Sequence, residues 1–305
     1  MNNYQQIQRN GGPRDIRGHS IASRFFLAPI NTGFAVNGSP LKKFWRFFSQ
    51  RSGHDIGITY VGNVSVGPKW CTNGRTPYFK GDLTQWRELS RLIEGQGSLP
   101  GLQLGCRVSN LIPQITWRRR APKAALHFIR DEVKAIPDSL IEEVIESFIT
   151  SARLAIESGF NVVQIHAAHG YFLARLLSTM LNRREDWIGK NPALVIRRIV
   201  EGIRRISSSA IIDVRISLRE GFSPWGVERS ERERIVGQIA QTDVDMISLS
   251  NGNYDFDKTL IYPPRRWVRF PSKPGHHSEA NHATIPKQTR PRFRAIRPPQ
   301  FDGVV

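Results

Sequence analysis

The sequence predicts an α/β fold of the (β/α)8 TIM barrel type, and three observations carry that prediction. Six short, mostly apolar runs alternate with longer segments of helical periodicity, as expected for buried parallel strands joined by helices. Polar residues follow the carboxyl ends of these runs, where barrels collect their chemistry. No Gly-x-Gly-x-x-Gly or P-loop sequence follows the first run, which argues against an open, doubly wound nucleotide-binding sheet.

The predicted strands share a short length and a predominance of apolar residues. They are residues 24–30, 56–62, 100–106, 160–166, 210–216 and 244–250. The predicted helices are residues 40–50, 83–94, 138–159, 191–206 and 228–241. The clearest is 138–159, where apolar residues from Ile141 to Ala155 recur at helical spacing. We expect Asp138 to cap its start and Gly159 to close its end.

The composition fits one large domain in a reducing compartment. The chain has 305 residues, of which 39% are hydrophobic, enough for a substantial core. Only two cysteines occur, Cys71 and Cys106, which argues against a disulfide framework. The first twenty residues lack the apolar core of a signal peptide, and no uninterrupted apolar run reaches the length of a membrane span. We therefore expect a soluble, cytoplasmic protein.

The net charge of +18 is the one compositional anomaly, and it raises the question of a polyanionic partner. Basic residues are spread over most of the chain, with one run at 118–120 and a scatter through the last forty residues. No aromatic or metal-binding nucleic-acid motif accompanies them. The sequence thus argues against specific nucleic-acid binding and indicates a basic protein surface.

Three hydrogen-bonding side chains stand close together in IHAAHGYFLARLL, residues 165–177: His166, His169 and Tyr171. A metal site, a polar core cluster and a substrate clamp would each use such residues. Two imidazoles without a third ligand at zinc spacing are a weak metal signal, so we predict no metal. From these residues alone, a polar cluster in the barrel rim and a substrate clamp both remain open, and Tyr171 could be an ordinary interfacial aromatic.

Several segments, taken in chain order, resemble the old yellow enzyme family of FMN-dependent ene-reductases. They are LAPIN, TYVGNVSV, PGLQLG, GFNVVQIHAAHGYFLARLLSTMLNRREDWIG, DVRIS and DMISLSNGNY. The most specific part is the His-x-Ala-His-Gly-Tyr motif leading into the Leu-Asn-Arg-Arg-x-Asp run that ends at Asp186. The resemblance covers residues 22–262.

This resemblance implies an FMN site built from successive strand ends. Its residues would be Ala28, Pro29, Ile30, Asn31, Gly62, Gln103 and Arg215. Gln103 would offer its amide to the pyrimidine edge of the flavin, and Arg215 would lie near N1 and O2, where a cation stabilises the reduced anionic cofactor. Seen alone, Arg215 could instead pair with an acid such as Asp213 or Glu220.

The resemblance also implies a substrate site and a reaction. His166 and His169 would hydrogen-bond a carbonyl or nitro oxygen of the substrate, with Ala167 and Ala168 completing the substrate-binding stretch. Tyr171 would give a proton to the α-carbon after flavin N5 delivers hydride to the β-carbon. The reductant would be NADH or NADPH, and the substrate an α,β-unsaturated carbonyl compound, a nitro compound or a quinone. Oligomer formation is compatible with the sequence.

Three regions follow from these patterns: a polar N-terminal segment (1–21), the barrel domain (22–262) and a basic, Pro-rich tail (263–305) that we expect to be disordered. Neither a seventh nor an eighth strand is recognisable in the tail, so the barrel is predicted to be incomplete. The resemblance implies that strand eight would end in a Gly-Arg pair that holds the FMN phosphate, and this pair cannot be found in the tail. One hypothesis is a truncated or frameshifted, inactive remnant. The other is a basic extension that completes the fold with a partner or binds a polyanion without catalysis.

Overall fold

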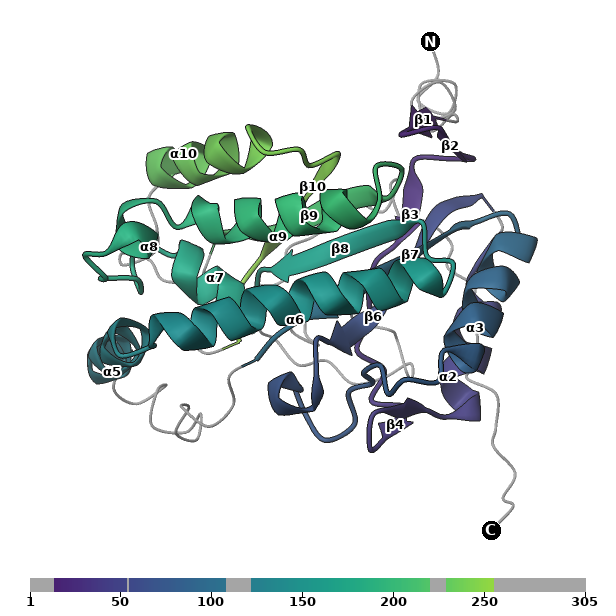
Figure 1. Ribbon diagram of the computed structural model, residues 1–305, viewed down its shortest axis with the longest axis horizontal. Coiled ribbons are helices and arrows are strands. Elements are labelled where there is room, and N and C mark those ends of the chain that lie inside the picture. The colour runs from purple at the N-terminus through teal and green to yellow at the C-terminus, as the bar shows by residue number, and fades with distance from the viewer. Residues whose placement is uncertain (1–13, 54, 108–121, 220–228, 255–305) are drawn as a thin grey trace, which may run out of the picture. The chain divides into compact units, whose positions relative to one another are not determined.

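A six-stranded parallel sheet forms the centre of the computed structural model, which describes residues 14–53, 55–107, 122–219 and 229–254 (Figure 1). In spatial order the strands are β10 (Met246–Asn251), β9 (Ile211–Arg219), β8 (Val162–Ala167), β7 (Leu99–Gly105), β6 (Ile56–Ser65) and β3 (Phe25–Leu27). Spatial order follows chain order without reversal, so the described strands contain no switch point of a doubly wound fold. Within the described ranges, these are six consecutive strands of an incomplete (β/α)8 barrel.

The five predicted helices are all present. They are α2 (Lys42–Ser49), α3 (Thr84–Gly95), α6 (Asp138–Glu157), α9 (Ala193–Ile206) and α10 (Arg229–Ala240). Helices α6 and α9 lie side by side along the sheet (Figure 1). The apolar stripe of α6 from Ile141 to Ala155 is buried, as its periodicity predicts. Among the described residues, no helix combines the length and the apolar character needed to cross a membrane.

Several short elements were not predicted. They are the hairpins β1 (Arg14–Ile16)/β2 (His19–Ile21) and β4 (Ala35–Val36)/β5 (Ser39–Pro40), the 3-10 turn η1 (Pro68–Trp70), and the helices α5 (Pro122–Lys134), α7 (Phe172–Leu177) and α8 (Trp187–Lys190). Helix α7 is buried on all sides, so no polar face marks a helical period. Most of the others are too short for any repeat to emerge. The predicted tail at 263–305 lies outside the described residues.

The sequence correctly predicts how α6 ends but not how it begins. The predicted capping role of Asp138 is wrong: Pro137 is the N-cap, and no side chain caps the helix. Asp138 is the first helical residue, and its carboxylate instead accepts a hydrogen bond from Arg184 at 2.5 Å. Gly159 follows the helix with φ of +87°, the left-handed conformation that closes helices, as predicted.

The N-terminal hairpin packs on the floor of the barrel, the amino-terminal end of the sheet. Ile21 of β2 packs in a small buried cluster with Ile58, Tyr60, Val162 and Ile211, which come from the amino-terminal halves of β6, β8 and β9. Part of the predicted polar segment 1–21 is therefore an ordered, partly buried element. It covers the amino-terminal ends of these strands, opposite to the strand ends that carry the predicted site.

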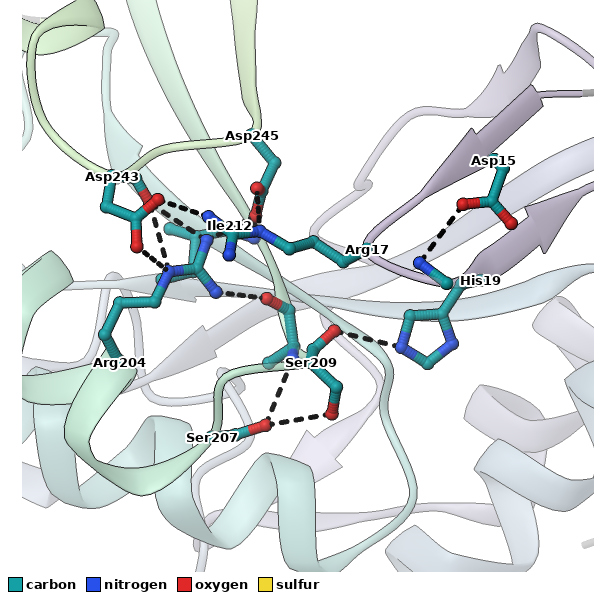
Figure 2. Close-up of polar contacts among 11 residues, drawn as sticks. Asp15, Arg17, His19, Arg204, Ser207, Ser209, Ile212, Asp243 and Asp245 are labelled. Atoms are coloured by element: carbon teal, nitrogen blue, oxygen red, sulfur yellow. Dashed lines mark hydrogen bonds and ion pairs between the residues drawn. The ribbon is translucent and has the colours of Figure 1, made fainter.

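A charged cluster fixes this hairpin to the sheet (Figure 2). Arg17 donates to Asp245 at 2.6 Å, and Arg204 also pairs with Asp245. The Asp245 carboxylate accepts the Ile212 backbone N–H at 2.8 Å, and Asp243 pairs with both guanidinium groups. Burial favours the neutral acid, but the hydrogen bonds from Arg17, Ile212 and Arg204 hold the pKa of Asp245 below its usual value. The cluster thus links the N-terminal hairpin to β9 and β10.

The close approach of β6 to the chain before β3 gives a test of this packing. A Cβ atom at Gly57 would lie 1.9 Å from the Ser23 carbonyl oxygen, so only glycine fits. We expect Gly57→Ala to lower the free energy of unfolding by about 3 kcal/mol, measured by urea denaturation. Gly95→Ala, at a helical position with no atom near the added Cβ, is the control and should stabilise by up to about 1 kcal/mol. Equal stability of the two variants would contradict the close packing.

Candidate functional site

The carboxyl ends of β8, β9 and β10 bring together a group of polar side chains, here called the rim cluster. Its members are His166, His169, Tyr171, Arg215, Ser250 and Tyr254. In the sheet, His166 is in register with Arg215, and Arg215 with Ser248. Side chains two residues apart share a face of a strand, so Ser250 lies on the same face as Ser248, one level further toward the rim.

Aromatic contacts hold the rim cluster together. The ring centroid of His166 lies 5.1 Å from that of His169 and 4.6 Å from that of Tyr171, and both pairs are edge to face. Tyr254, beyond β10, lies 6.2 Å from His169 and 5.6 Å from Tyr171. The three side chains singled out in the sequence are therefore neighbours in space.

Hydrogen bonds link the cluster across β9 and β10. Ser250 Oγ lies 2.6 Å from His169 Nε2 and accepts a hydrogen bond from Arg215 at 3.2 Å. His166 Nδ1 and Arg215 Nε are buried and make no hydrogen bond to any described residue. Because buried polar atoms rarely stay unsatisfied, these two nitrogens are suited to a bound ligand. Among the described residues Arg215 forms no ion pair with an acid, although it lies in the field of Asp213; Glu220 lies outside the described residues, so a pair with it stays a prediction.

The electrostatics leave two neutral imidazoles beside one cation. Burial lowers the pKa of His166 well below its usual value, and the nearby His169 and Arg215 lower it further. Burial and then Arg215 lower the pKa of His169 to about 4. Burial also lowers the pKa of Arg215, but a guanidinium keeps its charge in proteins. At neutral pH the site can donate N–H groups from all three residues to an electron-rich oxygen.

The backbone of His169 is fixed from two sides. It adopts a left-handed conformation with φ of +60°. Its N–H donates to Ser217 Oγ of β9 at 2.9 Å, and its carbonyl accepts from the Tyr254 N–H at 2.9 Å. At Gly170 a Cβ would lie 2.2 Å from the side chain of Asn253, so the turn after β8 packs directly on the chain after β10.

The predicted cofactor residues lie along the same end of the sheet. Gln103 is buried in β7, next to Gly62 of β6, where a Cβ would lie 3.0 Å from Gln103 Cβ. The stretch Ala28, Pro29, Ile30 and Asn31 follows β3 and is largely exposed.

Asn31 connects that stretch to β6. Its amide donates to Thr72 at 2.9 Å and to Asn63 at 3.2 Å. These hydrogen bonds run beside β6 rather than to the rim cluster. The Asn63 amide nitrogen is buried without a hydrogen-bond partner among the described residues, so it too is suited to a ligand.

Two other predicted features support the turn and the helices around it. Ala167 and Ala168 are buried, and the Ala168 carbonyl accepts the Tyr171 N–H at 3.2 Å. In the Leu-Asn-Arg-Arg-x-Asp run, Arg184 binds both Asp138 and Asp186, and Asp186 caps α8 through its side chain. This run therefore joins α6 to α8 and lies outside the rim cluster.

Sequence reasoning missed Ser250 and Tyr254. Ser250 could have been found, because Met246, Ser248 and Ser250 alternate along a predicted strand and so share one face. Tyr254 had no such signal, since it lies beyond the strand. In the part of the chain that the structure describes, no three His, Cys, Asp or Glu residues gather as metal ligands would.

Comparison with known proteins decides the family. The model of the NADH:flavin oxidoreductase / NADH oxidase family matches residues 12–283. The chain belongs to this family. It is an FMN-dependent NAD(P)H oxidoreductase, which confirms the resemblance to old yellow enzymes drawn from the sequence.

Individual relatives agree with this assignment. An NADPH dehydrogenase of Geobacillus sp. (strain WCH70) is 27% identical over 82% of this chain and 75% of its own length. The NADH-dependent flavin oxidoreductase iliE of Neonectria sp. (strain DH2) is 28% identical, and the match covers 82% of this chain but 36% of that longer protein. The crystal structure of Old Yellow Enzyme from Pichia sp. AKU4542 superposes with a TM-score of 0.66 at 16% identity, over 82% of this chain and 72% of that one. This likeness confirms the TIM-barrel fold.

The low pKa of His169 predicts how stability depends on pH. Between pH 6.5 and about 4 the unfolded chain binds a proton on this histidine and the folded chain does not, so stability falls as pH falls. The difference between the ordinary pKa of 6.5 and the pKa of about 4 in the folded protein corresponds to about 3 kcal/mol of unfolding free energy.

We expect His169→Asn to lose less unfolding free energy than the wild-type protein between pH 7 and pH 4, by up to that amount, in urea denaturation. The two proteins share every other titrating group, so the difference between their losses reports the titration of His169 together with its effect on the pKa of His166. Parallel losses in both proteins would show that His169 is not held neutral by the fold.

Proposed function

We propose that this oxidoreductase reduces activated C=C bonds at the rim cluster. The observation that carries the proposal is the convergence of two neutral imidazoles, a buried guanidinium and a tyrosine at adjacent strand ends, with His166 Nδ1 and Arg215 Nε available to a ligand. Such a site favours a substrate oxygen that gains negative charge during the reaction. Suitable substrates are α,β-unsaturated carbonyl compounds, nitroalkenes and quinones.

Residues on the β3 to β9 side would hold FMN. Gln103 would meet the pyrimidine edge, Arg215 would lie near the N1 and O2 side, and the stretch from Ala28 to Asn31 with Gly62 would border the ring. The buried, unpartnered nitrogens of Arg215 and Asn63 support this placement, since each needs an acceptor that FMN can provide. When bound, FMN accepts hydride from NADH or NADPH and delivers it to the β-carbon of the substrate.

The two histidines would orient and polarise the substrate. Each neutral imidazole has one N–H to donate, and His169 is fixed through its backbone and Ser250. Their hydrogen bonds to the substrate oxygen would strengthen as that oxygen becomes enolate-like. The nearby Arg215 charge adds to this stabilisation without itself exchanging a proton.

Tyr171 would supply the proton to the α-carbon. Its ring packs against His166 at 4.6 Å, and it lies at the start of α7, which fixes its backbone. General acids placed in this way contribute about 10²- to 10⁴-fold to a rate. Tyr254 lies 5.6 Å from Tyr171 and offers a second phenol for comparison.

The proton-donor role predicts a split between the two half-reactions. We expect Tyr171→Phe to slow reoxidation of the reduced enzyme by an α,β-unsaturated ketone by about 10²-fold or more. Flavin reduction by NAD(P)H should stay nearly intact, because no proton from the tyrosine is needed there. Anaerobic stopped-flow absorbance of the flavin measures both steps. The role is excluded if both half-reactions slow equally, or if Tyr254→Phe slows reoxidation as much as Tyr171→Phe.

The alternative is a protein that acts without catalysis through its basic surface, suggested by the net charge of +18. Purified protein separates the two functions. A yellow protein that bleaches with NAD(P)H without oxygen and recovers colour with an unsaturated ketone supports the enzyme. A colourless protein that takes up no added FMN supports the alternative. The compartment and the oligomeric state stay predictions.

A further inference from the structure

A second polar layer lies in the barrel interior directly below the rim cluster. It consists of Gln103, Gln164 and Asp213, here called the amide layer, which are in register across β7, β8 and β9. All three are at most 4% exposed. His166 and Arg215 stand two residues further along the same strands, so the rim cluster is the next layer toward the carboxyl ends.

Asp213 anchors the amide layer. Its Oδ2 accepts hydrogen bonds from the Tyr60 hydroxyl at 2.8 Å, from Ser248 at 2.7 Å and from the Gln164 amide. Burial, and then the charge of Asp213, raises the pKa of Tyr60 well above its usual value, so the tyrosine keeps its proton and donates. A carboxylate can only accept hydrogen bonds, so each of these neighbours must turn a hydrogen toward it.

This requirement fixes the orientation of Gln164. Its Nε2 donates both to Asp213 and to Ser248 Oγ, the latter at 3.3 Å, which places both amide hydrogens on the side of β9 and β10. Its Oε1 therefore faces β7, where it accepts a hydrogen bond from Gln103 Nε2 at 2.6 Å. Because the donor and acceptor arms of a primary amide point apart, the Gln103 carbonyl is turned away from Gln164.

We infer that Asp213, acting through Gln164, sets the polarity of Gln103 so that Gln103 offers a carbonyl acceptor to the N–H donor on the pyrimidine edge of FMN. The inference rests on the proposed contact between Gln103 and FMN. Asp213 and Gln164 are then positioning residues that need not touch the cofactor. A reversed Gln103 would present its NH2 to the N–H of the ring, and two donors facing each other in a buried site weaken binding.

The test first removes the carboxylate at Asp213 that orients Gln164. It then introduces a carboxylate at position 164, in the neighbouring strand, where it can orient Gln103 directly. Asp213→Asn leaves a group that can donate as well as accept, so Gln164 and Gln103 are free to reverse. We expect the Kd for FMN, measured by quenching of flavin fluorescence, to rise about tenfold, with a shift in the visible spectrum of bound flavin. Adding Gln164→Glu places the carboxylate beside Gln103, where it again accepts from the Gln103 amide. The double variant should bind FMN within about threefold of wild type.

A matched control removes a buried hydrogen bond elsewhere in the same sheet. Thr59 Oγ1 and Ser98 Oγ lie 2.8 Å apart near the floor of the barrel, and Thr59→Val should leave the Kd for FMN unchanged. Two results would overturn the inference. One is an Asp213→Asn variant that binds FMN as wild type does, and the other is a double variant no tighter than Asp213→Asn alone.

A second pair of variants decides the matter if Asp213→Asn does not fold. With Asp213 in place, the acid introduced by Gln164→Glu is pushed toward its neutral form, donates its proton to Asp213 and still accepts from Gln103. Gln164→Met keeps the volume and loses both hydrogen bonds. We expect affinity near wild type for the first and a loss of about tenfold for the second; equal affinities would overturn the inference.

The same full-length proteins distinguish this inference from the proposed function. If FMN affinity follows the variants as expected but no alkene is reduced, the ene-reductase proposal fails and the inference stands. If the wild-type protein binds no FMN, the inference itself fails.

Discussion

The register of the parallel strands β7, β8, β9 and β10 is the constraint on which the site depends. It places Gln103, Gln164 and Asp213 at one level and His166 and Arg215 at the next. A slip of one residue would turn every one of these side chains to the other face, into the apolar layer beneath the helices. Register is secured by that same layer, since β-strand residues such as Val163, Ile165 and Val214 are fully buried in the main core.

Burial of the sheet interior determines the hydrogen bonding of Asp213 and the pKa values of the two histidines. Ile21 of the N-terminal hairpin covers the amino ends of β6, β8 and β9, and the charges of Arg17 and Arg204 tie the hairpin to Asp245. Asp213 is fully buried, and its Oδ2 takes its hydrogen bonds from protein groups. The same burial lowers the pKa values of His166 and His169 and leaves neutral donors at the open end. Floor, amide layer and rim cluster are thus successive levels of one interior.

Much of this architecture could be predicted from the sequence, because it rests on patterns that extend over many residues. The alternation of apolar strands with amphipathic helices indicated the barrel, and the strand-end position of Gln103, His166 and Arg215 indicated the site. What escaped prediction depends on contacts between distant segments. Residues 14–21 are mostly polar in sequence, yet Ile21 packs in a buried apolar cluster. Arg17 binds acidic side chains more than two hundred residues further along the chain. Gln164 reads as one more polar strand residue until its partner in β9 is known.

Strand register places the proposed FMN site at the carboxyl ends of β6 to β9, with the rim cluster beside it. A crystal structure of the full-length protein with FMN bound is the direct test of this placement. We expect the pyrimidine edge within hydrogen-bonding distance of Gln103 and Arg215, with His166 and His169 facing the space beside the flavin ring. A flavin bound elsewhere, with Gln103 and Arg215 making no contact to it, would show that the placement is wrong.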